Sequence, residues 1–168
     1  QQNCSPPNPS LFSPHGIDIV QREDGKYQVL VVNHGGRESV DLFDLMPKVV
    51  NNPQTKNDSD NMTLFPKWTL FWRGCAQPPG DPFLNDVVGL SNGGFLVTHM
   101  WDKSHLYATL VLKYLLGIET GWVWGWQQET GFQRVENSSG VAPNGIAIDR
   151  RASIAYINMY GQNQLVAL

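Results

Sequence analysis

The sequence is poor in cysteine and in charge. Its 168 residues include two cysteines, Cys4 and Cys75, and charged residues make up 16% of the chain, with a formal net charge of −3. Two cysteines are too few for a cysteine-rich zinc module and allow at most one internal disulfide. The sequence also lacks a basic cluster, a helix-turn-helix pattern and a phosphate-binding glycine loop, so nothing in it favours nucleic-acid binding.

Long apolar runs are also missing. The most apolar segment, residues 105–118, has 14 residues, whereas a helix that spans a bilayer needs about 20. We expect this segment to be an ordinary buried helix or pair of strands, and a cap that rests on a membrane is the alternative. With 41% hydrophobic residues, the chain has the composition of one globular domain.

A hairpin signal is present near the N-terminus. Residues 14–34 form two runs rich in Ile, Val and Tyr on either side of Asp24-Gly25, a pair typical of a tight turn. If these two residues are the centre of the turn, counting outward places His15 opposite His34. The Cβ atoms of facing residues lie about 4.5–5.5 Å apart, so two imidazoles there can share a proton, a water or a metal. A pair of histidines without a function is the alternative.

The same hairpin plan recurs twice, in residues 84–100 and 143–159. Aligning PHGI with LNDV and PNGI places His15, Asn85 and Asn144 at equivalent positions. A recurring unit of about 40–60 residues with a hairpin at its centre is typical of a blade of a β-propeller. Because the first strand of each blade lines the central channel, we expect these three side chains to converge as a ring of ligands.

Other segments are consistent with an all-β fold. Residues 39–45 alternate like an outer strand, and residues 69–74 can supply another. Residues 46–60 are polar and interrupted by prolines, which predicts an exposed loop. Residues 121–127 alternate Trp with small residues, as expected for a strand with one aromatic face.

The predicted fold class is therefore all-β, a β-propeller of which residues 1–168 form a partial domain with about three blades. Propellers have about 4–8 blades, and three cannot close a ring. We expect the chain to be part of a longer protein or to pair with another copy of itself.

Four motifs in the chain resemble a known family. They are PHGI (14–17), VVNH (31–34), LNDV (84–87) and PNGI (143–146), in this order. Together they resemble the paraoxonase and arylesterase proteins and their wider relatives, the gluconolactonase-type and strictosidine-synthase-like propellers. The resemblance covers most of residues 13–168. It implies a six-bladed β-propeller with calcium in its channel that hydrolyses lactones and esters.

The resemblance also implies roles for individual residues. His15 and His34 would form a catalytic dyad, and Asn85 and Asn144 would be calcium ligands. The other expected ligands, acidic residues from a preceding blade and a later Asp-Asn pair, find no match in the sequence, as expected for a partial propeller. The Gly-Gly pair after His34 and the segment THMW depart from the family pattern, so the resemblance does not imply a substrate preference.

The expected chemistry combines the metal with the histidines. Calcium prefers about 6–8 oxygen ligands, and an ion held by amide oxygens can polarise a carbonyl and stabilise an oxyanion. His15 would take a proton from water, and His34 would relay it. Asp86 is expected to lie behind the ligands and support them. A solvated side chain, or one that hydrogen-bonds within its own hairpin, is the alternative. His99 and His105 are expected to be structural.

The sequence thus predicts a calcium-dependent hydrolase of small-molecule lactones or esters. A non-catalytic binding or structural propeller, in which calcium only stabilises the fold, is the alternative. The strand edges of a partial ring would favour self-association. Four Asn-x-Ser/Thr triplets favour a secreted or periplasmic protein whose leader has been removed; they begin at Asn3, Asn57, Asn61 and Asn137.

Overall fold

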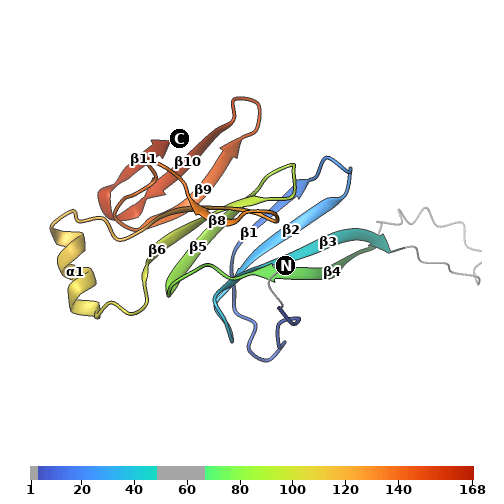
Figure 1. Ribbon diagram of the computed structural model, residues 1–168, viewed down its shortest axis with the longest axis horizontal. Helices are drawn as coiled ribbons and strands as arrows, with labels where there is room; N and C mark the ends of the chain where they lie inside the picture. Colours follow the sequence, from blue (N-terminus) through green and yellow to red (C-terminus); the bar gives the residue numbers. More distant parts are fainter. Residues whose placement is uncertain (1–3, 49–66) are drawn as a thin grey trace, which may run out of the picture.

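The computed structural model describes residues 4–48 and 67–168. These residues form three antiparallel sheets, a 3-10 turn η1 (Tyr160–Gln162) and one α-helix (Figure 1). The first sheet contains, in spatial order, β1 (Pro14–Gln21), β2 (Tyr27–Asn33), β3 (Ser39–Lys48) and β4 (Lys67–Ala76). Most of the described chain is therefore β-structure, as the sequence predicted.

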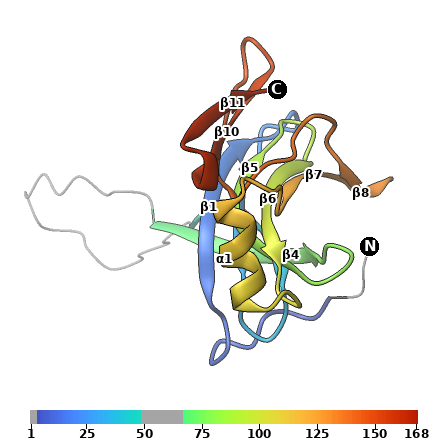
Figure 2. The same ribbon diagram turned by 90° about the vertical axis from the view of Figure 1, so that its left-hand side faces the viewer.

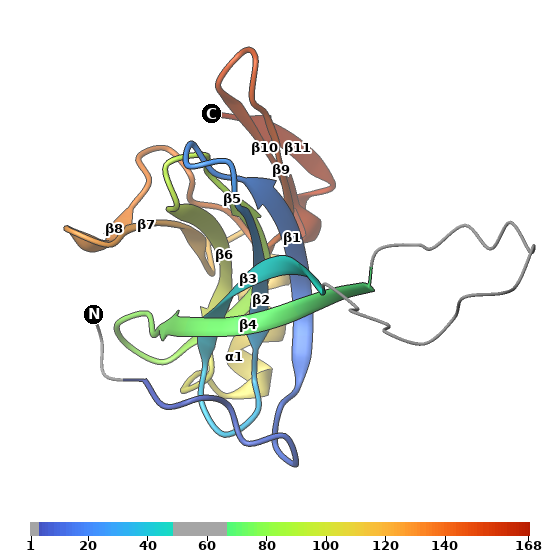
Figure 3. The ribbon, with the colours of Figure 1, turned by 90° about the vertical axis from the view of Figure 1, so that its right-hand side faces the viewer.

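The second and third sheets repeat this meander. The second contains β5 (Pro82–Gly89), β6 (Phe95–Asp102), β7 (Trp122–Gln127) and β8 (Gly131–Arg134). The third contains β9 (Pro143–Asp149), β10 (Ile154–Met159) and β11 (Gln164–Ala167). The first strands lie side by side, because β5 packs against both β1 and β9 (Figure 3).

The predicted outer strands are present as β3 and β4, and the predicted aromatic strand is β7. The predicted loop, residues 46–60, differs at its start. Residues 46–48 are exposed but belong to β3 and pair with residues 67–69 of β4. Side chains at the loop end of a hairpin can be exposed even where the backbone is paired. The remainder of the predicted loop lies outside the described residues.

The first hairpin closes with a three-residue loop. Arg22 N donates a hydrogen bond to the carbonyl of Lys26 at 2.8 Å. The loop ends in Gly25 at a φ of +80°, and the second hairpin ends its equivalent loop in Gly93 at a φ of +91°. A type I turn followed by a residue in the left-handed region is a common three-residue connection, and glycine adopts that region without strain.

This loop shifts the register of the first hairpin by one residue. A two-residue turn at Asp24-Gly25 would pair Ile17 with Val32, whereas Ile17 pairs with Val31. The position of the turn was predicted correctly, but the register was wrong. The sequence pair Asp-Gly is compatible with both loop lengths, and only the backbone conformation distinguishes them.

Each first strand contains a β-bulge at the same place. In β1, Pro14 pairs with Asn33 and Ile17 with Val31, so the two residues between Pro14 and Ile17 oppose Val32 alone. A bulge of this kind bends the strand and redirects a side chain.

The same two-against-one arrangement recurs in the other two first strands. Residues 85–86 of β5 oppose Thr98, and residues 144–145 of β9 oppose Asn158. The three positions that the motif alignment placed in one column are therefore equivalent in the structure.

Two apolar clusters join the sheets. The cluster between the first and second sheets consists of Leu30, Val32, Val40, Leu42, Ala76, Leu84, Val87, Phe95 and Val97. The cluster between the second and third sheets consists of Val88, Val123, Ile146, Ala155, Ile157 and Met159. Val87 and Val88 belong to different clusters because successive side chains of a strand point to opposite faces. The second sheet is thus packed on both faces.

The apolar segment 105–118 contains the helix α1 (Tyr107–Leu115), which has no buried residue. The expectation of ordinary burial was wrong, because α1 lies at the end of the sheets and not between them (Figure 2). Leu106, Leu115 and Leu116 are exposed. Within the described ranges, no helix is long and apolar enough to cross a membrane.

The two cysteines form a disulfide, with a Cα–Cα distance of 5.7 Å between Cys4 and Cys75. The bond attaches the segment before β1 to the end of β4. Arg37 supports the same attachment, because its Nη1 donates to the carbonyl of Ser5 at 2.9 Å.

Candidate functional site

The two predicted dyad histidines are in contact. His15 Nδ1 lies 3.0 Å from His34 Nε2, and the rings meet edge to face with centroids 5.1 Å apart. They do not face each other across the ladder, because His34 N donates to the carbonyl of Ser13 at 3.0 Å. The pair is diagonal, and the bulge at His15 brings its side chain toward His34.

The other ring nitrogen of His34 contacts Glu38, a residue that we did not predict. His34 Nδ1 lies 2.9 Å from Glu38 Oε1. Glu38 also accepts the N–H of Leu84 at 2.7 Å and a hydrogen bond from Lys103 Nζ at 3.2 Å. The only sequence signal was a carboxylate four residues after a candidate histidine, in a loop whose conformation the sequence does not specify.

Glu38 is held as a carboxylate. Burial of the side chain, which is 8% exposed, raises its pKa. The hydrogen bonds from His34 and the Leu84 amide, together with the charge of Lys103, outweigh burial and lower the pKa below its ordinary value. Glu38 is therefore an ionised hydrogen-bond acceptor at neutral pH.

Aromatic rings fix the plane of His34. Its imidazole stacks on Phe83 with centroids 4.5 Å apart and an interplanar angle of 11°. Phe83 in turn stacks on Trp101 with centroids 5.1 Å apart. Rotation of the His34 ring would break this stack and the two hydrogen bonds together.

The predicted asparagines lie beside the dyad. Asn85 Nδ2 is 3.5 Å from His15 Nε2 and 3.2 Å from Met100 Sδ. Asn144 Nδ2 lies 3.9 Å from the same sulfur. The bulges thus bring the side chains of His15, Asn85 and Asn144 together at one end of the first strands.

Asp86 links two bulges. Its carboxylate accepts the N–H of Val87 at 2.9 Å and that of Ile146 at 3.0 Å. The hydroxyl of Thr98 accepts from Asp86 N at 2.9 Å and donates to the carbonyl of Asn144 at 2.6 Å. These bonds fix the backbone behind Asn85 and Asn144, and the bond to Val87 lies within the hairpin of Asp86 itself.

The first bulge packs directly on the second. A Cβ atom at Gly16 would lie 2.5 Å from the carbonyl oxygen of Asn85 and 2.6 Å from the Cα of Asp86. Only glycine permits this approach. The equivalent Gly145 has more room, since its Cβ would meet the Asp86 carboxylate at 3.8 Å.

The side chains around the dyad can be compared with the ligands that a metal ion needs. Among residues 4–48 and 67–168, no three His, Cys, Asp or Glu side chains gather as a metal-binding group. The oxygens of Asn85 and Asn144 are a different donor set, and neither Oδ1 accepts a hydrogen bond from a described residue. Neutral amide oxygens suit calcium, so the two residues fit this ion in kind and would supply two of its about 6–8 ligands.

The remaining two histidines have separate surroundings. His99 is buried and packs against Trp122 with ring centroids 4.3 Å apart. Burial lowers its pKa, and the Asp102 carboxylate, 3.2 Å from His99 Nε2, opposes that shift only in part. His105 Nε2 lies 3.2 Å from Lys113 Nζ. Within the described chain, no hydrogen bond or ring contact joins either residue to the dyad.

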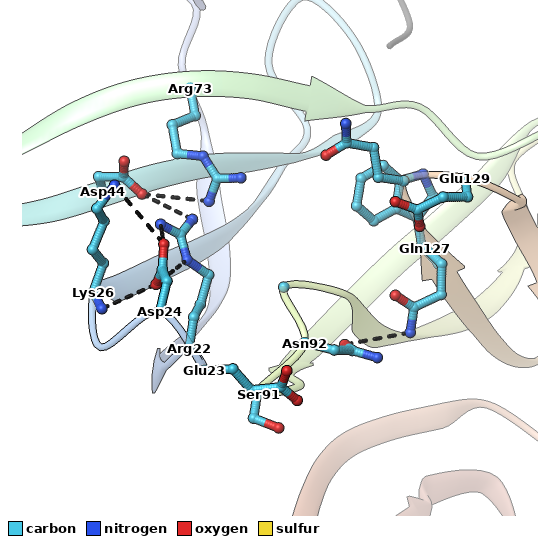
Figure 4. A pocket seen from close by; sticks show the side chains of 13 residues that line it. Arg22, Glu23, Asp24, Lys26, Asp44, Arg73, Ser91, Asn92, Gln127 and Glu129 are labelled. Atoms are coloured by element: carbon cyan, nitrogen blue, oxygen red, sulfur yellow. Dashed lines mark hydrogen bonds and ion pairs between the residues drawn. The ribbon is translucent and has the colours of Figure 1, made fainter.

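A polar pocket of about 450 Å³ lies at the opposite end of the strands, beside the first two hairpin turns (Figure 4). Arg22 pairs with both Asp24 and Asp44 at 3.1 Å. Arg73 Nη1 donates to Gln28 at 2.7 Å and lies 3.4 Å from Asp44. The arginines and aspartates of this pocket are partners of one another, and Glu23 and Glu129 line it as exposed carboxylates.

No protein-family model matches the chain, and no curated protein matches it.

Proposed function

We propose that the protein is a calcium-dependent hydrolase of lactones or esters, built as a six-bladed β-propeller to which this chain contributes three sheets. The observation that carries the proposal is the contact of His15 with His34 at 3.0 Å, next to the amide of Asn85. A general base must lie within hydrogen-bond reach of the proton that it takes. His15 is exposed, so water can reach it.

The roles follow from the surroundings of each residue. Asn85 and Asn144 would hold calcium through their amide oxygens. When bound, the ion supplies polarisation of the substrate carbonyl and stabilisation of the developing oxyanion. His15 accepts a proton from the attacking water, and His34 receives a proton from His15. Phe83 and Glu38 keep His34 in place.

The propeller is supported by the exposed face of the first sheet. Ile17 and Ile19 of β1 are 65% and 51% exposed. The register of the four paired strands, together with the alternation of side chains along each strand, places Trp68 and Leu70 of β4 on the same face. The opposite face of this sheet is packed against the second sheet. A further sheet that covers the exposed face continues the same stacking, and a longer chain or a second copy would supply it.

The disulfide supports an extracytoplasmic location. Such bonds form and persist in the secretory pathway and the periplasm and are rare in the cytosol. A secreted or periplasmic protein is therefore part of the proposal.

The test uses the complete protein that contains this chain. Hydrolysis of a lactone and of an aryl ester is measured with added calcium and with a chelator. We expect turnover that the chelator abolishes and that His15→Gln and His34→Gln lower strongly. His105→Gln is the matched control and should leave turnover unchanged. Turnover that survives both the chelator and the dyad variants would contradict the proposal.

The second candidate is a binding or structural propeller in which calcium only stabilises the fold. The exposed apolar side chains of α1 and of the first sheet favour it, because large apolar patches mark contact surfaces. The same experiment separates the two functions. A chelator that lowers the melting temperature of a protein without measurable turnover would favour the binding module.

A further inference from the structure

We propose that Glu38 is a positioning residue that fixes the protonation of the dyad and makes Nε2 of His15 the atom that accepts the proton. This inference rests on the proposed function for its catalytic meaning. Its structural content, the position of two ring hydrogens, can be measured without any substrate.

The first step is the hydrogen between Glu38 and His34. An ionised carboxylate has no hydrogen to donate. The 2.9 Å contact between Glu38 Oε1 and His34 Nδ1 therefore places the hydrogen on Nδ1. A neutral imidazole carries one ring hydrogen, so Nε2 of His34 is left with a lone pair.

The second step is the hydrogen between the histidines. His34 Nε2 can only accept, so the 3.0 Å contact requires His15 to donate from Nδ1. Nε2 of His15 then holds a lone pair. This nitrogen lies 3.5 Å from Asn85 Nδ2, so the basic end of the relay lies beside the amide cluster and away from Glu38.

The third step is the path of the proton during the reaction. Water gives a proton to His15 Nε2 and its remaining hydroxide is the nucleophile. The hydrogen on His15 Nδ1 can then move to His34 Nε2, which places the positive charge next to Glu38. A carboxylate at hydrogen-bond distance stabilises an imidazolium. The hydroxide adds to the carbonyl carbon, and the tetrahedral adduct then breaks its bond to the leaving oxygen. His15 Nε2 gives the proton taken from water to that oxygen, and the hydrogen on His34 Nε2 returns to His15 Nδ1. The products are the acid and the alcohol, and the starting tautomers are restored.

Glu38 is itself immobilised by its neighbours. Leu84 N and Lys103 Nζ are its other donors, and Lys103 also lies 3.5 Å from Asp81. His99 is a further titratable group within electrostatic reach of Glu38. Three donors on one buried carboxylate hold its orientation, which the tautomer argument requires.

The test is the ring nitrogen spectrum of the histidines in the complete protein labelled with ¹⁵N-histidine. We expect His34 to carry its hydrogen on Nδ1 and His15 to carry its hydrogen on Nδ1, with a free Nε2. In Glu38→Gln the amide can donate or accept, so His34 should populate both tautomers. Turnover in this variant should fall about 10- to 100-fold, as when a carboxylate behind a functional histidine is removed.

The matched control is Asp81→Asn, which touches Lys103 and not the dyad. It should keep the wild-type tautomers and turnover. Glu38→Asp tests the geometry, since the shorter carboxylate should restore the tautomer only in part. If Glu38→Gln does not fold, the wild-type spectrum alone decides. A hydrogen on Nε2 of His34 in the wild type would overturn the inference. The expected tautomers in a protein without hydrolytic activity would uphold the inference about Glu38 and refute the proposed function.

Discussion

The two ends of the β1–β2 hairpin differ in how their polar groups are satisfied. At the turn end, Arg22 contacts Asp24 and Asp44, and Arg73 contacts Asp44 as well. At the other end, the chain of contacts runs from Glu38 through His34 to His15 and finishes at His15 Nε2, which lies 3.5 Å from Asn85 Nδ2.

This difference separates a structural network from a candidate site. Buried and half-buried polar groups in proteins are normally satisfied by one another. The paired arginines and aspartates of the turn end follow that rule. At the histidine end, the Oδ1 atoms of Asn85 and Asn144 accept no hydrogen bond from a described residue.

The largest expected effect is on turnover. His15→Gln should lower the turnover of the complete protein by about 10²–10⁴-fold, the range for loss of a general base. Folding should survive, since the buried strand residues Leu30 and Val32, and not the polar end, hold the hairpin. Asp24→Asn at the turn end should leave turnover unchanged. Equal losses in both variants would remove the distinction between the two ends.

The next effect concerns calcium. If Asn85 and Asn144 hold the ion, replacing either residue with Ala should reduce the increase in melting temperature that calcium produces. An ion present at 100 times its Kd stabilises the folded state by about 2.7 kcal/mol. Melting temperatures with calcium and with chelator measure this increase directly. A calcium effect of unchanged size in Asn85→Ala would place the ion elsewhere.

A third effect tests the bulges that bring the site together. Gly16→Ala should destabilise the protein by about 1–3 kcal/mol, the usual cost of overpacking, because the new Cβ meets backbone atoms at 2.5–2.6 Å. Gly145→Ala is the matched control in the third bulge, where the nearest atom is 3.8 Å away. Urea unfolding of both variants gives the comparison. Similar losses of unfolding free energy in the two variants would mean that the close contacts at Gly16 do not cause the loss.

The sequence predicted much of the fold because its signals are local. Asp-Gly and Asn-Gly pairs located the turns, alternation located the strands, and the motif alignment found equivalent positions. The approach of His15 to His34 was predicted from a register that was wrong. The contact survived because a diagonal pair is also within reach of two imidazoles once a bulge redirects one of them.

What the sequence could not supply depends on contacts between distant segments. Glu38 is held by Leu84 of β5 and by Lys103, the residue after β6. Glycine inside a strand often marks a bulge, and Gly16 and Gly145 lie in two of the three bulges. The third bulge has Asp86 at that place, so the residue pattern alone does not locate all three. The helix α1 is apolar nearly all round, and its composition does not reveal whether a neighbour covers it.

The smallest expected effect is on the pH dependence of stability, which can be compared for Glu38 at the histidine end and Asp24 at the turn end. The pKa of Glu38 lies below its ordinary value of 4.5, so its ionised form contributes stability above that pH. The contribution is lost as the pH falls through the lower pKa of the folded state. Glu38→Gln should therefore be less stable than the wild type at pH 7, and the difference should shrink in acid. Urea unfolding at a series of pH values measures it.

Asp24 at the turn end provides the control for this effect. The Lys26 amide and the Arg22 side chain lower its pKa as well, so the sign of the pH dependence is the same. Asp24 is exposed, however, and solvent screens exposed pairs strongly, so Asp24→Asn should change the free energy of unfolding much less than Glu38→Gln. If the free energy of unfolding changes more with pH in Asp24→Asn than in Glu38→Gln, the ion pairs of the turn end contribute more to stability than Glu38 does.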